Sequence, residues 1–316
     1  MSTAVLTVRS ARRIRLWPGF VLVVLLALAG WSIAGGIILC EGALHANRVS
    51  VSVEPARALA TELSASFRDV QILAADSVPL RGWLFEPVQA CGSTVMLFHG
   101  MADSRTSELG YARLLLKHGF RVLAADERGN GSSGGDIETF GVRERFDTHA
   151  WADWLFANTP TTRLYGLGES MGAGVLLQSL TAEPRFRAVA AESSFQNFRE
   201  VAYDRVAQHF GTRLSLKRPL YFGIIESGML YAWWRYGVDL DGASPEDAVA
   251  RTRTPVLLIH GLADDNVYPV QSERMAASNP GRVVLWEPAK ACHTCALGTV
   301  PEEFEGRVIG WFTSHP

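Results

Sequence analysis

The chain has few cysteines, almost no net charge, no internal repeat and no low-complexity tract. Its 316 residues include four cysteines, and 30 basic against 32 acidic residues leave a formal net charge of −2. Four cysteines in a chain of this length do not make a disulfide scaffold. The bulk electrostatics of a nearly neutral chain argue against a nucleic-acid partner. The length therefore predicts one large folded domain or two small ones.

Charged residues are also missing from one long stretch, residues 17–39, which reads "WPGFVLVVLLALAGWSIAGGIIL". As a helix these 23 residues would extend roughly 34 Å, and a hydrocarbon core is about 30 Å thick. We expect a transmembrane helix over 17–39, after a cytoplasmic basic N-terminus at 1–16 and before a linker at 40–65.

Basic residues gather on one side of this stretch. Four arginines precede it: Arg9, Arg12, Arg13 and Arg15. The first basic residue after it is Arg48. The positive-inside rule then predicts a cytoplasmic N-terminus and a catalytic domain on the extracytoplasmic side, whether periplasmic, extracellular or lumenal. A cleaved signal peptide is the main alternative, although its apolar core would usually be about 7–15 residues long. A buried helix is the third interpretation.

Short apolar segments recur through the rest of the chain. "FRDVQILAA" and "PLRGWLFEP" flank Asp76-Ser77, which predicts a hairpin. Six runs follow: "TVMLFHG", "FRVLAADERG", "RLYGLGE", "FRAVAAESS", "PVLLIHG" and "RVVLWEP". Near-continuous apolar runs suit parallel strands that are buried on both faces. Together they predict an α/β domain over 66–316, with a doubly wound, mostly parallel sheet.

Helical periodicity fills the intervals between these runs, as in 106–118, 142–157 and 171–182. In 142–157 one face collects five apolar side chains, those of Phe146, Ala150, Trp151, Trp154 and Leu155.

One interval, 195–250, is too long for a simple crossover and predicts a helical cap insert. Ligands bind outside the carboxyl ends of such strands, so the insert is expected to cover a pocket. It contains several aromatic residues, namely Tyr221, Phe222, Tyr231, Trp233, Trp234 and Tyr236. They form either the apolar underside of the cap or a surface for an acyl chain or a membrane.

The segment "DERGNGSSGG" contains a G-x-G-x-x-G pattern at Gly129, Gly131 and Gly134. A dinucleotide loop would open a helix directly and would need a carboxylate at a strand end about 20 residues later. The next helical pattern begins only near Val142, and no such carboxylate follows. We therefore expect no cofactor here. The glycines permit positive φ angles in a loop whose shape Asp126 and Arg128 hold.

A second glycine cluster, "LYGLGESMGAG", places Ser170 between Gly168 and Gly172. It joins a strand-like run to a helical one and fits the G-x-S-x-G nucleophile elbow, a strained turn that needs small residues two positions either side of the serine. Ser170 is the candidate nucleophile. The alternative is a glycine-rich turn with an exposed serine.

A nucleophilic serine needs a base, and the base needs an acid that orients it. Downstream, "VLLIHGLADDNVYP" places Asp264 and Asp265 just past a buried strand, and "VVLWEPAKACHTC" places His293 past the next one. The chain order Ser, Asp, His is that of α/β hydrolases. All three groups are expected at one edge of the sheet, with Ser170, Asp264 and His293 as the catalytic residues.

Here the chain resembles the α/β-hydrolase superfamily over about residues 66–314. "HGLADDNVYP" resembles the acid loop of prolyl-oligopeptidase-type serine hydrolases, which implies that Asp264 rather than Asp265 is catalytic. "LFHGMADS" resembles the oxyanion loop, which implies the backbone N–H groups of Met101 and Met171 as the oxyanion hole. Met101 and Asp103 depart from the small or amide residues of many relatives.

Two further segments extend the resemblance. "DERGNGSSGG" resembles the D-x-R-G-x-G-x-S loop of the superfamily. The "GWLFEP" hairpin and the "RTRTPVLLIHG" lead-in resemble small-cap members, which are often membrane-anchored.

The resemblance implies a membrane-anchored serine hydrolase that cleaves a carboxylic ester, as a lipase, esterase or thioesterase does, through an acyl-enzyme and without cofactor or metal. The substrate would be a small-molecule or lipid ester, with the bilayer contacted through 17–39. A peptidase or amidase and an acyltransferase would use the same triad. A tethered binding protein that keeps only the fold is the non-enzyme alternative.

Cys292 and Cys295 bracket His293 in "CHTC". A zinc site would need a second pair of ligands to complete its tetrahedron, and the chain offers none. A local disulfide that stiffens the His293 loop is one interpretation if the domain faces an oxidising compartment, and the sequence leaves the oxidation state of the two cysteines open. Cys91 precedes its strand and is expected at the opposite edge of the sheet.

Overall fold

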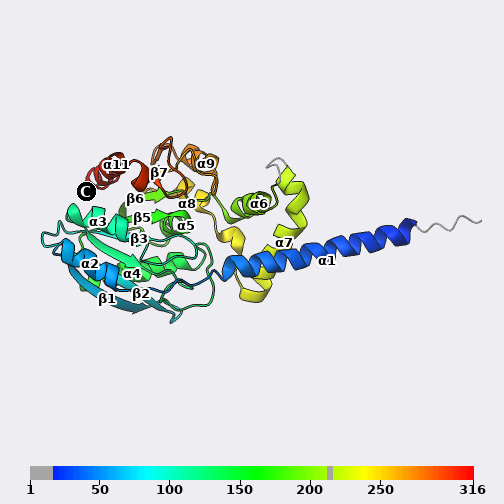
Figure 1. Cartoon of the computed structure of the whole chain (residues 1–316), viewed down its shortest axis with the longest axis horizontal. Coiled ribbons are helices and arrows are strands. Elements are labelled where there is room, and N and C mark those ends of the chain that lie inside the picture. The colour runs from blue at the N-terminus through cyan, green and yellow to red at the C-terminus, as the bar shows by residue number, and fades with distance from the viewer. Residues whose placement is uncertain (1–16, 212–215) are drawn as a thin grey trace, which may run out of the picture.

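The computed structural model describes residues 17–211 and 216–316. Figure 1 shows an α/β domain with one long helix, α1, projecting from it. The sheet has eight strands in the order β1-β2-β4-β3-β5-β6-β7-β8. Their bounds are Ser66–Leu73 (β1), Pro79–Glu86 (β2), Ser93–Phe98 (β3), Arg121–Ala125 (β4), Arg163–Glu169 (β5), Phe186–Glu192 (β6), Val256–Ile259 (β7) and Val283–Trp286 (β8). All eight predicted strands are confirmed.

Only the first part of the sheet is antiparallel. β2 pairs antiparallel with both β1 and β4, whereas every pairing from β4 through β3 to β8 is parallel. The hairpin turns at the predicted place, where Ser77 has a φ of +67° and its N–H donates to the Ala74 carbonyl at 2.8 Å. The doubly wound, mostly parallel sheet with an antiparallel start is therefore confirmed.

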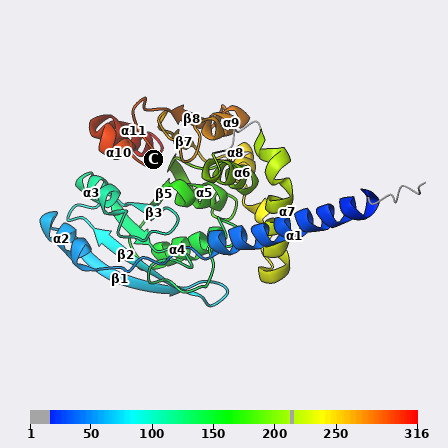
Figure 2. The same ribbon diagram turned by 45° about the vertical axis from the view of Figure 1, so that its right-hand side comes forward.

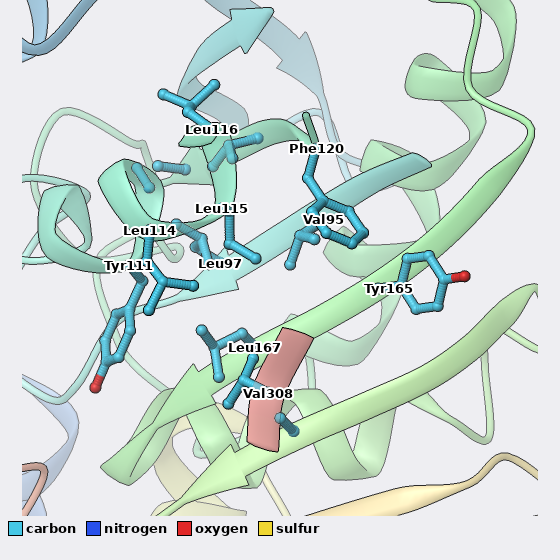
Figure 3. Close-up of a cluster of buried hydrophobic side chains, with 14 of the residues drawn as sticks. Val95, Leu97, Tyr111, Leu114, Leu115, Leu116, Phe120, Tyr165, Leu167 and Val308 are labelled. Atoms are coloured by element: carbon cyan, nitrogen blue, oxygen red, sulfur yellow. The ribbon is translucent and has the colours of Figure 1, made fainter. Parts of the chain in front are cut away.

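Helices cover both faces of the sheet. One face carries α2 (Glu54–Glu62), α3 (Leu109–Lys117), α10 (Ala296–Thr299) and α11 (Pro301–Thr313). The other carries α4 (Glu144–Asn158), α5 (Ser170–Ser179), α8 (Pro245–Arg251) and α9 (Val270–Ser278). Figure 3 shows the first core, where side chains of α3, β3, β5 and α11 meet.

The central strand β3 shows how the sequence produces two cores. All six of its residues are buried, and successive side chains point to opposite faces. Val95 and Leu97 join the core under α3 and α11, while Met96 and Phe98 join the core under α4 and α5. Burying each such side chain contributes about 1.5–3 kcal/mol, so an apolar run without alternation is what this position requires.

The helix α4 corrects one expectation. Phe146, expected on the same face as Trp151 and Leu155, is 55% exposed, while Trp151 and Leu155 are buried as expected. The buried face instead includes Asp147, whose carboxylate accepts from the Arg128 guanidinium at 2.6 Å. The Arg128–Asp147 ion pair thus occupies the buried face of α4, where the hydrophobic pattern predicted the ring of Phe146.

The segment predicted as a linker is partly helical. α1 runs over Trp17–Leu44, so it continues five residues into that segment, and α2 occupies Glu54–Glu62. Ala56, Leu59 and Ala60 of α2 are buried in the core under α3, and Pro55 stands in its first turn. The sequence did not predict α2, because its few small apolar residues form only a weak helical pattern within a mostly polar stretch.

The predicted cap insert is helical, residues 212–215 lying outside the described part. It forms α6 (Phe198–His209), α7 (Lys217–Tyr236) and the 3₁₀ turn Leu240–Gly242 before α8 returns to the sheet. Side chains of α6 and α7 form a third apolar cluster with Met171 and with Cys40 and Leu44 of α1. Both views show α7 crossing α1 beside the domain (Figure 1 and Figure 2).

Candidate active site

Ser170 stands at the sharp turn from β5 into α5. Its φ is +51°, in the left-handed region that residues other than glycine rarely adopt. Such strain persists only where the surrounding structure enforces it, and it gathers at functional sites. The backbone has the geometry of a nucleophile elbow, with the serine raised above the strand end.

The two glycines of the motif let neighbouring backbone approach this turn. A Cβ on Gly172 would collide with the carbonyl oxygens of Phe98 and His99, at the end of β3. A Cβ on Gly168 would lie 2.8 Å from the carbonyl oxygen of Gly172. The glycine spacing is therefore explained by α5 packing directly onto strand ends.

The structure brings Ser170, His293 and Asp264 together in one hydrogen-bonded chain. The Ser170 hydroxyl donates to His293 Nε2 at 2.8 Å, and His293 Nδ1–H donates to Asp264 Oδ2 at 2.8 Å. The three residues come from the loops after β5, β8 and β7. They lie at one edge of the sheet because parallel strands end on the same side.

Asp264 is held as a carboxylate. Its Oδ1 accepts from the N–H groups of Asn266 and Val267, each at 2.9 Å. Burial raises its pKa, but hydrogen bonds from His260 and His293 outweigh that effect and lower the pKa well below its usual range. Asp265 is exposed and uses its backbone carbonyl to accept from Gln208 at 2.8 Å. Asp264 is thus the aspartate of the pair that contacts the histidine.

The loop after β3 lies against the serine. Gly100 approaches Ser170 so closely that a Cβ on the glycine would lie 3.6 Å from the serine Cβ. Met101, Ser170 and Met171 line one cavity, and Met171 is in the first turn of α5, where backbone N–H groups have no partner within the helix. Buried His99 holds the loop, because its Nδ1–H donates to the Gly100 carbonyl at 2.7 Å.

Cys292 and Cys295 form a disulfide around His293, with their Cα atoms 5.2 Å apart. Within it Thr294 has a φ of +51°, and its N–H donates to Ser193 Oγ at 3.2 Å. The bond consumes both thiols, so they do not act as a zinc pair here. Cys91 is exposed and precedes β3, at the opposite edge of the sheet as expected.

The loop 126–135 is built around its own charged groups. The Asp126 carboxylate accepts from the N–H groups of Arg105 at 2.9 Å and Ser132 at 2.7 Å. Gly129 and Gly131 have φ angles of +79° and +45°, and a Cβ on Gly131 would collide with the Asp126 carboxylate. The glycines thus serve a folded loop beside the sheet, as expected from Asp126 and Arg128.

Among the described residues, one set of side chains has ligand atoms close enough together to hold a metal ion, namely His149, Asp153 and Glu183. The Arg185 guanidinium contacts both carboxylates, donating to Asp153 at 2.6 Å and to Glu183 Oε1 at 2.7 Å. Because the arginine already pairs with both carboxylates, the cluster is an ion-pair network.

Sequence comparisons agree with this geometry. A family model described as serine aminopeptidase, S33, matches residues 89–220. YqkD of Bacillus subtilis is 28% identical over 198 residues, which are 61% of this chain and 62% of YqkD, so the match spans less than two thirds of that relative. The α/β-hydrolase domain-containing protein WAV2 of Arabidopsis thaliana is 26% identical over 240 residues, 73% of this chain and 72% of WAV2.

Solved structures extend the likeness across the domain. The Pyrococcus furiosus esterase Pf2001 matches with a TM-score of 0.68 at 26% identity, over 86% of this chain and 99% of the esterase. The chain belongs to the α/β-hydrolase superfamily. A second structure, the Pyrococcus horikoshii acylaminoacyl peptidase, shares this hydrolase fold with a TM-score of 0.59 at 17% identity, over 79% of this chain and 42% of the peptidase.

Behind Ser170 lies a cluster of acidic groups that the sequence did not lead us to expect. Glu169 and Glu192 end the neighbouring strands β5 and β6 and are paired in register. The Tyr111 hydroxyl lies 3.1 Å from a Glu169 oxygen and 3.0 Å from a Glu192 oxygen. Fully buried Glu108 is close enough to repel both carboxylates. The signal was present: "GLGES" and "VAAES" both end in Glu-Ser.

Burial and mutual repulsion keep protons in this cluster. Burial, followed by repulsion from Glu192, raises the pKa of Glu169 from 4.5 to about 7. Burial also raises the pKa of Glu192, and burial with repulsion from Glu169 raises that of Glu108 well above its ordinary value. At neutral pH the protein therefore holds protonated carboxyl groups beside the turn that carries Ser170.

Replacing Gly172 with alanine should disrupt the turn, because the new Cβ meets backbone that has no room to move. We expect Gly172→Ala to lower the free energy of unfolding by about 2 kcal/mol or more. Gly306→Ala is the matched control, since nothing lies within 4 Å of a Cβ there. It should leave stability unchanged or raise it by up to about 1 kcal/mol. Urea unfolding of both variants measures this, and equal stabilities would contradict the steric account.

Glu169 should make the folded state less stable as pH rises. The folded protein keeps the Glu169 proton up to a pKa of about 7, against 4.5 ordinarily, so stability falls between those values. Glu169→Gln removes the ionisation, and its stability relative to wild type should rise by about 1–3 kcal/mol from pH 4.5 to 8. Urea unfolding at both pH values, beside the exposed control Glu302→Gln, measures this. An unchanged difference for Glu169→Gln would refute the burial effect.

Proposed function

We propose that this protein is a membrane-anchored serine hydrolase that cleaves a carboxylic ester, with Ser170, His293 and Asp264 as its catalytic residues. The observation that carries the proposal is the hydrogen-bonded chain from Ser170 through His293 to Asp264, with both links at 2.8 Å. A cavity beside Ser170, lined mainly by apolar side chains, supports an ester with an apolar acyl group.

In the first half of the reaction, Ser170 Oγ attacks the carbonyl carbon while His293 Nε2 takes the hydroxyl proton. Asp264, held ionised by its hydrogen bonds, orients the imidazole and stabilises its cation. The backbone N–H groups of Met101 and Met171 bind the oxyanion, and such a donor is worth on the order of 100–1000-fold in rate. The C–O bond to the leaving group breaks, and His293 gives its proton to the departing alcohol.

In the second half, water attacks the acyl-Ser170 carbonyl and His293 takes a proton from that water. The ester bond to Ser170 breaks, the serine recovers its proton from His293, and the carboxylic acid leaves. Each half thus uses the histidine once as base and once as acid.

Ester substrates are favoured over amides by the resemblance to an esterase. Pf2001 is matched at 26% identity over almost its whole length, whereas the acylaminoacyl peptidase is matched at 17% over less than half of it. A peptidase or amidase is the second candidate, because the matching family model is described as a serine aminopeptidase. The same residues would perform either reaction.

Membrane anchoring is proposed for α1. Its segment Pro18–Leu44 is long and apolar enough to cross a membrane, which a signal sequence would also satisfy. The disulfide Cys292–Cys295 supports an extracytoplasmic domain, since such bonds persist in oxidising compartments. The four arginines that suggest an N-terminus inside lie outside the described residues.

A variant series tests the catalytic assignment. Ser170→Ala should abolish labelling by a fluorophosphonate probe and hydrolysis of p-nitrophenyl esters, because the attacking oxygen is gone. Asp264→Asn should slow hydrolysis by roughly 10⁴-fold, because the histidine would lose the group that sets its tautomer. Asp265→Asn, its matched control, should stay within about twofold, as expected for an exposed side chain away from the histidine.

Undiminished labelling of Ser170→Ala would refute the nucleophile, and equal losses in the two asparagine variants would refute the choice of Asp264. Aminoacyl amides assayed beside the esters separate the two candidate functions. Faster cleavage of the amides would favour the peptidase.

Topology is tested in sealed right-side-out vesicles that carry the full chain with a different tag at each end. External protease should remove the C-terminal tag and spare the N-terminal one, and activity should stay with the membranes after an alkaline carbonate wash. Loss of the N-terminal tag from the mature chain, with activity in the wash, would identify a cleaved signal peptide. A C-terminal tag that is protected until detergent is added would reverse the orientation.

A further inference from the structure

The carboxyl-terminal part of α1 is not a free tether, because it packs tightly against α7 of the cap. A Cβ on Gly36 would lie 2.6 Å from the backbone nitrogen of Gly228, and a Cβ on Gly228 would lie 2.8 Å from the Gly36 carbonyl oxygen. The Ser227 hydroxyl donates to the Ser32 carbonyl at 2.9 Å. Backbone contact of this kind fixes the position of α1 relative to the cap.

The same part of α1 forms a wall of the cavity that contains Ser170. The cavity has a volume of about 420 Å³, within the range of small-molecule sites. α1 contributes six of its lining residues, namely Gly36, Ile38, Leu39, Cys40, Gly42 and Ala43. α6 and α7 supply facing side chains such as Val206, Ile225 and Met229. The expected membrane helix therefore continues directly into the binding site.

The lining suits a hydrocarbon chain. Among the lining residues that the structure describes, only Ser170 has a hydroxyl group and only Arg205 has a charged side chain. The rest are apolar side chains, glycines and Cys40. An acyl chain whose ester carbonyl lies at Ser170 would find apolar surface from α1, α6 and α7 along its length.

The depth of the crossing point is set by helix geometry. An apolar helix needs about 20 residues to cross a hydrocarbon core of about 30 Å. Counted from Trp17, that brings the outer limit of the core to about Gly36, where α1 meets α7. The first half of α1 extends beyond the rest of the described chain, as a spanning segment would (Figure 1 and Figure 2).

At that depth α7 presents large apolar side chains outward. Trp233 is 60% exposed and Trp234 72%, and Leu220, Phe222 and Leu230 are exposed as well. Tyr231 and Tyr236 turn the other way, and both hydroxyls donate to Glu41 of α1 at 2.6 Å. Tryptophan on an apolar helix surface is typical of the membrane interface.

We infer that α1 residues 36–43 form one wall of an acyl-chain subsite and that the substrate is an ester with a long acyl chain supplied by the bilayer. The outward face of α7 then lies in the extracytoplasmic interface of the membrane that α1 crosses. This inference rests on the proposed ester hydrolase. It assigns to the anchor helix a part in substrate recognition, and it places the Gly36 end of the cavity wall at the outer limit of the hydrocarbon core.

Acyl-chain selectivity tests the subsite. The purified full chain is assayed in detergent on p-nitrophenyl esters with acyl groups of 2 to about 16 carbons. For the wild type, kcat/KM should rise by up to about fourfold per added CH₂ until the cavity is filled. Gly42→Phe places a ring on the α1 wall and should lower the ratio of long-chain to short-chain kcat/KM by at least about tenfold. Gly30→Phe, on the same helix with nothing within 4 Å and outside the cavity lining, should keep the wild-type ratio.

The source of the chain is tested with the protein reconstituted in phosphatidylcholine vesicles that contain a long-chain fluorogenic ester. Trp234→Lys should lower the ratio of vesicle activity to micelle activity by about tenfold, because it removes an interfacial anchor and adds a charge. Val88→Lys, at a similarly exposed apolar residue in the loop between β2 and β3, should keep the wild-type ratio.

Each outcome bears on one part of the inference. An unchanged chain-length ratio in Gly42→Phe would overturn the subsite. Equal ratios in Trp234→Lys and Val88→Lys would overturn supply from the bilayer and leave soluble acyl esters as the source. Absence of fluorophosphonate labelling in the wild type would instead refute the proposed hydrolase, and this inference with it.

Discussion

The close approach of α5 to the end of β3 is the constraint on which the site depends. Gly172 packs against the carbonyls of Phe98 and His99, and the turn between β5 and α5 is then short enough to force Ser170 to a φ of +51°. That conformation raises the hydroxyl toward His293. The helix N-terminus and the loop carrying Met101 come to the same point by the same contact. A single steric condition thus positions both the Ser170 hydroxyl oxygen proposed to attack and the N–H groups proposed to receive the oxyanion.

Much of the fold was predictable because buried parallel strands leave a strong pattern. Runs such as "TVMLFHG" and "PVLLIHG" are apolar on both faces and end in turn residues, so strand positions and the common edge of Ser170, Asp264 and His293 followed from chain order. What sequence could not provide was the balance between polar and apolar burial. Asp147 is buried in an ion pair with Arg128 of the loop after β4. The neighbouring Phe146 on α4 therefore faces solvent.

The acidic cluster was missed for a related reason. In the sequence, Glu169 and Glu192 are ordinary strand-end carboxylates. Only the strand register places them side by side, and only the tertiary fold brings Glu108 close to both. Likewise, the apolar stretch 17–39 predicted a span, but its sequence did not identify the cap as the partner of its end or place that end in the cavity wall. Contacts between segments almost 200 residues apart, such as Ser227 with Ser32, have no local signature.

Trapping the acyl-enzyme tests the central claim most directly. Brief reaction with a long-chain ester, acid quenching and peptide mass mapping would locate the covalent group. The account predicts one acyl group, on the peptide containing Ser170, that disappears as turnover is completed. An acyl group on another residue, or steady hydrolysis with no acylated peptide, would contradict it.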